Sequence, residues 1–218
     1  MKFGKTLRRL IQETLPEWRD KFLSYKDLKK LVRLIAMTQP CSTAEAKFIY
    51  LVNGEIDKFN TFFEEQEEEF IIRQKEFQER IKEVIETYGL TGSQPNEEHY
   101  AAAMAGIEMD IVNFHGEMVL LKNYSNINCT GLSKILKKYD KRTGGLLRLA
   151  FIEYILKQPF LTTDQISELV KECESTIDSV FPAPRQEQPE RRDEASVVAE
   201  QGILRNVVAA VETMQELQ

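Results

Sequence analysis

Apolar residues recur every three or four positions through most of the chain, which is the period of an amphipathic α-helix. The pattern predicts a first helix over 5–13, a second that follows Pro16 directly and ends before Gln39, and a long helix over 44–88. A returning helix is expected over about 100–121, where the spacing alternates between four and three as in a heptad seam. We therefore predict an all-α fold in which a helical hairpin at the N-terminus packs on a bundle with two long antiparallel helices.

The later segments are predicted from their breaks and caps. Residues 123–129 are rich in Asn and are expected to form a loop, which a short lysine-bearing helix follows up to Thr143-Gly144-Gly145. Two further helices are expected over 146–156 and from Thr162 or Thr163 to about Val180, with Pro159 between them.

Composition changes after the last of these helices. We expect residues 1–181 to form one domain. Residues 182–196 are Pro-rich and charged without apolar anchors, which is typical of a flexible linker. Residues 197–218 are amphipathic again and are expected to form a C-terminal helix that docks on the domain or on a partner.

The net charge of −6 hides a segregation of charge along the chain. Residues 1–40 carry ten Lys/Arg against four acidic residues, and residues 130–148 carry six against one. Residues 41–129 and 149–218 are acidic, with seven bases against seventeen acids and six against thirteen. Such segregation favours a focused anion site on an acidic body over a broad nucleic-acid-binding surface.

Four lysines at helical spacing mark the candidate site. Lys134, Lys137, Lys138 and Lys141, here called the lysine stripe, fall within about 100° of one another on a helix. On spacing alone, a solvated basic face explains the stripe as well as an anion site does.

A second basic helix favours the anion site. Tyr25, Lys29 and Arg33 are spaced i, i+4, i+8, so a phenol, an ammonium and a guanidinium share one helical face. If the fold joins this face to the lysine stripe, the two make a concave site for a highly charged phosphate compound.

Other functions find little support. The chain has no His/Cys/Asp constellation or Gly-rich phosphate loop, so we expect neither an enzyme nor a bound metal or cofactor. Aromatic residues are not interleaved with the lysines, which disfavours direct nucleic-acid binding. No run approaches the ~18 consecutive apolar residues of a membrane-spanning helix, and the N-terminus lacks the apolar core of a signal peptide. We therefore expect an intracellular protein that does not enter membranes. Cys41, Cys129 and Cys173 are expected to be free thiols, and His99 and His115 to be structural or surface residues.

Several motifs resemble the SPX domain, in the form found in plant single-domain SPX proteins. They lie in the expected order at 1–5, 15–30, 114–121, 123–125 and 130–144. The resemblance implies binding of inositol polyphosphates, either inositol hexakisphosphate or an inositol pyrophosphate. It also implies that the loaded domain binds and inhibits a MYB coiled-coil phosphate-starvation transcription factor, in the nucleus and cytoplasm.

The resemblance also selects the ligand-binding residues. Tyr25, Lys29 and Lys141 match the family's phosphate-binding cluster, and Lys134, Lys137 and Lys138 match its neighbouring lysine surface. Lys2 and Arg33 complete the candidate set. The alternative is a helical protein-interaction scaffold that acts without a ligand.

Overall fold

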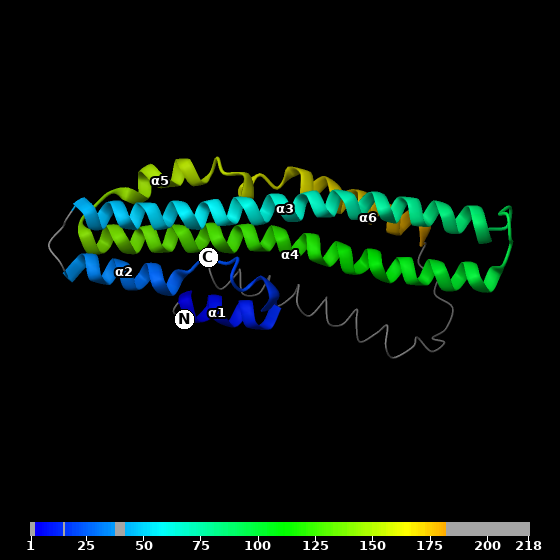
Figure 1. Ribbon diagram of the computed structural model, residues 1–218, viewed down its shortest axis with the longest axis horizontal. Coiled ribbons are helices and arrows are strands. Elements are labelled where there is room, and N and C mark those ends of the chain that lie inside the picture. The colour runs from blue at the N-terminus through cyan, green and yellow to red at the C-terminus, as the bar shows by residue number, and fades with distance from the viewer. Residues whose placement is uncertain (1–2, 15, 38–41, 182–218) are drawn as a thin grey trace. The chain divides into compact units, whose positions relative to one another are not determined.

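The chain folds into α-helices joined by short connections (Figure 1). The structure is a computed structural model and describes residues 3–14, 16–37 and 42–181. The α-helices are α1 (Phe3–Thr14), α2 (Tyr25–Met37), α3 (Ser42–Tyr88), α4 (Glu97–Thr143), α5 (Leu147–Ile155) and α6 (Asp164–Val180), with 3-10 turns η1 (Pro16–Trp18) and η2 (Pro159–Leu161). No strand occurs in these described ranges, and the predicted all-α fold is confirmed.

Two compact units divide these helices, and α3 and α4 contribute to both. In the first unit, described over residues 3–65 and 121–163 apart from the gaps, α3 and α4 run antiparallel. Early in α3, Phe48 stacks on Tyr139 with ring centroids 4.5 Å apart. Later in α3, Phe62 meets Tyr124 at 5.0 Å. Later residues of α3 therefore contact earlier residues of α4, which confirms that the two helices are antiparallel, as predicted.

Tyr124 is the centre of the first unit's core. Its side chain is fully buried. Four aromatic rings meet it edge-on with centroids 5.0–6.2 Å away, contributed by Trp18, Phe22, Phe59 and Phe62. Edge-to-face pairs of this kind add to the free energy gained by burial, so the segment before α2 is fixed against α3 and α4.

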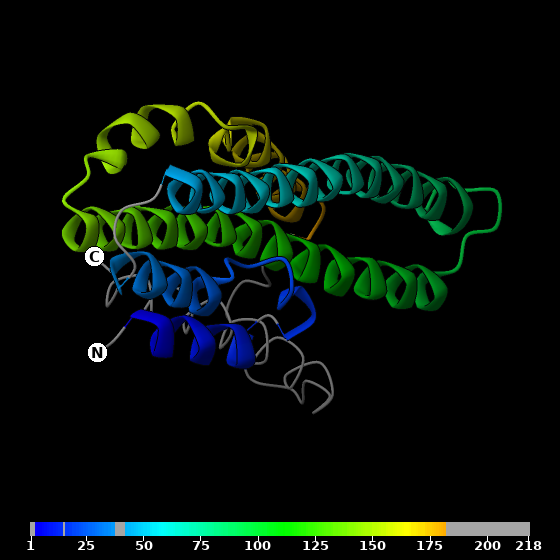
Figure 2. The same cartoon turned by 60° about the vertical axis from the view of Figure 1, so that its left-hand side comes forward.

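The helices α1 and α2 run in opposite directions as the predicted hairpin (Figures 1 and 2). The ring of Phe3 meets Tyr25 at 4.8 Å, so the first turns of the two helices touch. In the first unit, α5 lies on the other side of the α3–α4 pair from this hairpin.

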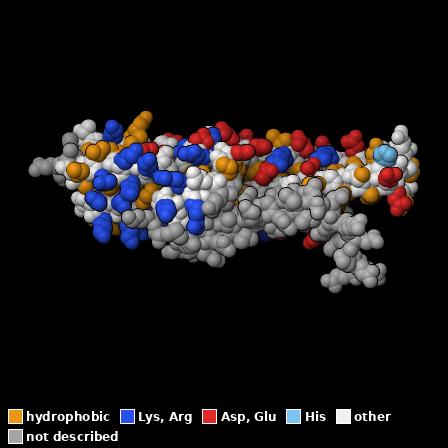
Figure 3. Space-filling model, turned by 90° about the horizontal axis from the view of Figure 1, so that it is seen from below, with side chains coloured by type: hydrophobic (Ala, Val, Ile, Leu, Met, Phe, Trp, Pro, Cys, Tyr) orange, Lys and Arg blue, Asp and Glu red, His pale blue; other side chains and the backbone are white. Residues whose placement is uncertain are grey.

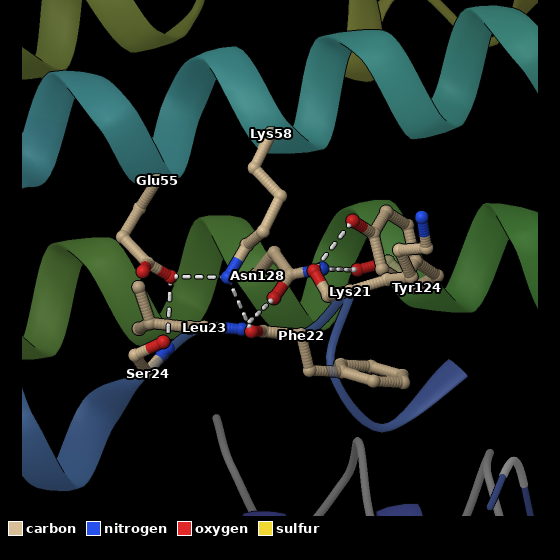
Figure 4. A network of polar contacts seen from close by, with 8 residues as sticks. All are labelled: Lys21, Phe22, Leu23, Ser24, Glu55, Lys58, Tyr124 and Asn128. Carbon is tan, nitrogen blue, oxygen red and sulfur yellow. Dashed lines mark hydrogen bonds and ion pairs between the residues drawn. The ribbon is translucent and has the colours of Figure 1, made fainter. Parts of the chain in front are cut away.

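The second helix begins later than predicted. It starts at Tyr25, and the chain from Pro16 forms one 3-10 turn and an irregular stretch instead of continuing as helix. The reason is that side chains of α3 and α4 bind the backbone there (Figure 4). The hydrogen bonds run from Tyr124 Oη to the Lys21 carbonyl (3.0 Å), from Lys58 Nζ to the Phe22 carbonyl (2.9 Å), from the Leu23 amide to Asn128 Oδ1 (2.9 Å) and from the Ser24 amide to Glu55 Oε2 (2.8 Å).

The predicted loop over 123–129 and the separate lysine helix are both wrong, because α4 continues unbroken to Thr143. Two of the polar residues that suggested a loop, Ser125 and Asn128, are buried inside the helix and hydrogen-bonded within it, whereas Asn126 is exposed. Ser125 Oγ donates to the Leu121 carbonyl at 3.3 Å, and Asn128 Nδ2 donates to the Tyr124 carbonyl at 3.0 Å. The helix ends where predicted, and Gly144 follows with φ 75°, a left-handed conformation that closes helices.

The second unit is described over residues 66–120 and 164–181. Phe70 and Phe77 of α3 meet Phe114 of α4 with centroids 5.5 and 5.3 Å away. The helix α6 packs on α4 through the buried thiol of Cys173 and through a hydrogen bond between His115 Nε2 and Glu174 Oε1 at 3.1 Å. His115 therefore has a structural partner, as the sequence suggested.

Some predictions concern residues that the structure does not describe, Cys41 among them. The expected linker over 182–196 and the C-terminal helix over 197–218 lie outside the described residues, as does Lys2. The boundary of the predicted domain at residue 181 stays a prediction.

Candidate anion-binding site

The last turns of α4 present the lysine stripe to solvent. Lys137 and Lys141 are exposed, and Lys134 and Lys138 are partly exposed. The opposite side of the same turns is buried and consists of Leu132, Ile135, Leu136 and Tyr139. The stripe is therefore held on a fixed helix, and Figure 3 shows Lys and Arg side chains gathered on this face of the first unit.

The fold brings α2 next to the stripe. Partial burial lowers the pKa of Lys138, and the nearby charges of Lys29, Arg142 and Lys141 lower it further. Lys29 belongs to α2, more than a hundred residues away along the chain. The two basic segments identified from the sequence thus form one electrostatically coupled cluster.

A pocket of about 210 Å³ opens between α1 and α2. Its lining residues are Gly4, Lys5, Arg8, Tyr25, Lys26 and Lys29. Lys5 and Arg8 were missed as site residues, although their i, i+3 spacing on the polar side of α1 was a readable signal. The absence of a side chain at Gly4 matters here, because an added Cβ would lie 3.1 Å from the Tyr25 ring.

Tyr25 has the properties of a neutral hydrogen-bond donor. It is partly buried, and burial raises the pKa of its phenol, so the group stays protonated at physiological pH. Its ring rests on Phe3, and Lys134 Nζ lies 5.7 Å from the centre of the Phe3 ring. Phe3 therefore links α1 both to α2 and to the lysine stripe.

The other candidate residues lie outside the pocket between α1 and α2. Arg33 is exposed on α2 and does not line the pocket, and neither do the four residues of the stripe. Next to Tyr25 and Lys29 on α2, Lys30 Nζ donates a hydrogen bond to Asp27 Oδ1 at 2.8 Å, and this hydrogen bond lowers the pKa of the Asp27 carboxyl. The structure thus joins Tyr25 and Lys29 in one pocket and places the stripe on the adjoining surface of α4.

Two hydrogen bonds to the backbone, a buried one from α4 and an exposed one from α3, position the pocket. The Leu23 amide is held by Asn128 and the Ser24 amide by Glu55, immediately before α2 begins at Tyr25. Glu55 is in turn paired with Lys58 at 2.8 Å. Because these bonds fix the start of α2 to both long helices, they fix the direction in which Tyr25 projects.

Comparison with known proteins identifies the domain. A sequence profile described as the SPX domain matches residues 1–40 and 86–155. The chain belongs to the SPX domain family. It is 52% identical over 218 residues to SPX domain-containing protein 5 of Oryza sativa subsp. indica, covering 100% of this chain and 82% of the relative. It is 53% identical over 220 residues to SPX domain-containing protein 3 of Arabidopsis thaliana, covering 100% of this chain and 85% of the relative.

The two segments that match the SPX profile contain the whole candidate set. Residues 1–40 include α1 and α2, and residues 86–155 include the lysine stripe. The anchor residues Glu55 and Lys58 lie between the matched segments. These SPX relatives are named for the domain and not for a catalytic activity.

The described part of this SPX chain presents cations of α1, α2 and the end of α4 to solvent. Within it, no group of three or more His, Cys, Asp or Glu residues is placed to hold a metal ion. No described helix is long and apolar enough to cross a membrane. The chemistry that the site does provide is a set of flexible ammonium groups around a phenol donor, which suits phosphate oxygens.

Proposed function

We propose that this SPX protein is a sensor of cellular phosphate status that binds inositol polyphosphates at the cluster formed by α1, α2 and the end of α4. The single observation that carries the proposal is that Lys29 of α2 lies beside Lys138 at the end of α4, where burial and then the charges of Lys29, Arg142 and Lys141 lower the pKa of Lys138. Like charges held this close repel one another, and a multiply charged anion relieves that repulsion. Membership in the SPX family is consistent with such a role.

The shape of the cluster favours a polyphosphate over a single phosphate ion. The pocket supplies a phenol and several cations, and the stripe adds further cations on the adjoining surface of α4. One inorganic phosphate can contact only a few of these groups at once. Inositol hexakisphosphate or an inositol pyrophosphate carries many phosphates on one ring and can contact both regions, so it gains from multivalency.

Isothermal titration calorimetry tests the ligand class. We expect an inositol pyrophosphate to bind far more tightly than inorganic phosphate. Replacing Lys137, Lys138 and Lys141 by Ala should weaken binding by about 100-fold, from about 1 kcal/mol for each lost charge contact. The matched control replaces Lys75, Lys82 and Lys171 of the second unit, which removes the same charge from exposed positions elsewhere. Equal losses in the two triple variants would mean that only net charge matters and would contradict the site.

We further propose that the loaded protein binds a MYB coiled-coil transcription factor and lowers its DNA binding, in the nucleus as well as in the cytoplasm. Without ligand, the cationic cluster repels another basic surface such as a DNA-binding domain. A bound polyanion reverses that charge and can lie between two basic surfaces. By linkage, the partner must raise ligand affinity by the same factor as the ligand raises partner affinity.

A pull-down with purified components tests the partner. Capture of the transcription factor should require the inositol pyrophosphate and should fail for the Lys137/Lys138/Lys141 variant. Equal capture with and without the ligand would instead support the alternative of a scaffold that acts without a ligand.

A further inference from the structure

A second pocket adjoins the one between α1 and α2. It also has a volume of about 210 Å³, and we call it the Arg19 pocket. Arg19 and Ser24 line only the Arg19 pocket, whereas Arg8, Tyr25 and Lys26 line both pockets. The two pockets are therefore neighbours that share a wall, and the Arg19 pocket reaches from that wall to the segment before α2.

The Arg19 pocket is cationic. Arg8, Arg19 and Lys26 line it and are exposed. Among the described residues that line it, Asp27 is the one acid, and its carboxylate accepts a hydrogen bond from Lys30 Nζ at 2.8 Å. Because Lys30 offsets the charge of Asp27, the three cations give the pocket a net positive charge.

The backbone around Arg19 is held in place, although the side chain is exposed. The ring of Trp18, the preceding residue, meets Phe62 of α3 at 5.0 Å and Tyr124 of α4 at 6.0 Å. Two residues after Arg19, the carbonyl of Lys21 accepts the hydrogen bond of Tyr124 Oη. The guanidinium therefore extends from a fixed segment, which lowers the entropy that a ligand must remove on binding.

The donors of the Arg19 pocket suit a phosphate group. A guanidinium can donate two parallel hydrogen bonds to phosphate oxygens, and the pocket has two arginines, Arg8 and Arg19. The exposed hydroxyl of Ser24 adds a neutral donor. A terminal phosphate offers three strong acceptor oxygens, so it can use all of these donors, whereas a carboxylate offers two oxygens.

Cations connect the end of α4 to the Arg19 pocket. Lys138 lies beside Lys29, and Lys29 lines the pocket between α1 and α2. Arg8 lines that pocket and the Arg19 pocket, and Arg19 lines the latter alone. A polyphosphate that spans the lysine stripe and the pocket between α1 and α2 would therefore have the Arg19 pocket at its far end.

We propose that the Arg19 pocket is a subsite for the terminal phosphate of a diphosphate group, so that Arg19 sets a preference for an inositol pyrophosphate over inositol hexakisphosphate. This proposal rests on the proposed function, because it concerns one end of the same ligand. A diphosphate projects one phosphate farther from the inositol ring than a single phosphate does. Arg19 then contacts only the pyrophosphate ligand, while Arg8, which lines both pockets, contacts both ligands.

Isothermal titration calorimetry on the full chain tests the subsite with inositol hexakisphosphate and an inositol pyrophosphate that carries one diphosphate group. The parent chain should bind the pyrophosphate at least about tenfold more tightly. Arg19→Gln should bring the two affinities to within about twofold, by weakening pyrophosphate binding and leaving hexakisphosphate binding nearly unchanged. Arg8→Gln should weaken the binding of both ligands.

The control variant Lys157→Gln removes the same charge from an exposed position of the first unit outside both pockets, and it should leave the ratio of the two affinities unchanged. Circular dichroism should show the parental helix content in every variant. Three results would overturn the subsite alone: no preference in the parent chain, a preference that Arg19→Gln leaves intact, or equal losses of both ligands in Arg19→Gln. A parent chain that binds neither ligand would overturn the proposed function and the subsite together.

Discussion

Asn128 offers the sharpest test of how the fold positions the candidate site. Its side chain is completely buried in α4, and Oδ1 accepts the hydrogen bond of the Leu23 amide, 105 residues away in sequence. Replacing Asn128 by Ala leaves that amide buried without an acceptor. An unsatisfied buried amide costs about 1–3 kcal/mol of stability. The change from Asn to Ala within a helix returns about 0.5 kcal/mol through higher helix propensity.

The same helix supplies a matched control. Asn126 is exposed two residues earlier, so Asn126→Ala gains the helix propensity and loses no buried partner. We therefore expect Asn128→Ala to unfold at lower urea concentration than Asn126→Ala, with a difference of about 2 kcal/mol in the free energy of unfolding. Urea titrations followed by far-UV circular dichroism measure this difference.

The perturbation should also reach the ligand site. The Leu23 amide lies two residues before Tyr25, so its release loosens the start of α2 while every cation of the pocket is kept. We expect weaker polyphosphate binding for Asn128→Ala and parental binding for Asn126→Ala. If the two variants were equally stable, the hydrogen bond to Leu23 would not hold this segment, and the account of the later start of α2 would be wrong.

Three further predictions concern single groups. Tyr25→Phe should weaken polyphosphate binding by about 1–2 kcal/mol in calorimetry, because it removes one hydrogen-bond donor to a charged acceptor. If the variant bound as tightly as the parent protein, Tyr25 would be a packing residue only. Tyr124→Phe should lower the free energy of unfolding by about 0.5–1.5 kcal/mol in urea titrations, because it deletes the hydrogen bond to the Lys21 carbonyl and keeps the ring; no change would show that this bond contributes nothing. The pKa of Lys138 is lowered in the free protein and should rise when a polyanion binds. Binding at alkaline pH should therefore take up a proton, and the affinity should fall as the pH rises past the pKa of Lys138 in the free protein. Calorimetry in buffers of different ionisation enthalpy measures that uptake, and Lys138→Ala should reduce it.

Hydrophobic periodicity alone predicted most of the helices. It placed the first helix at 5–13, against Phe3–Thr14, and the long helix at 44–88, against Ser42–Tyr88. Periodicity succeeds here because each helix buries one continuous stripe, so every turn repeats the signal. Breakers were equally reliable, since Gly144 ends α4 and Pro159 separates α5 from α6.

Local reasoning failed where polar residues are buried. The Asn-rich stretch over 123–129 has the composition of a loop, yet it lies inside α4 because Asn128 satisfies the backbone of a segment distant in sequence. The same contacts explain why α2 does not begin at Pro16. Side chains of α3 and α4 bind the carbonyls of Lys21 and Phe22 and the amides of Leu23 and Ser24.

The sequence by itself determined the helical class, the two basic segments and the residues Tyr25, Lys29 and the lysine stripe as candidates. Only the tertiary structure decided which cations lie together. Lys5 and Arg8 join Tyr25 and Lys29 in one pocket, while Arg33 lies outside it. The physical reason is that helical spacing fixes which side chains share one helix face, whereas the proximity of two helices depends on buried contacts between residues far apart in the chain.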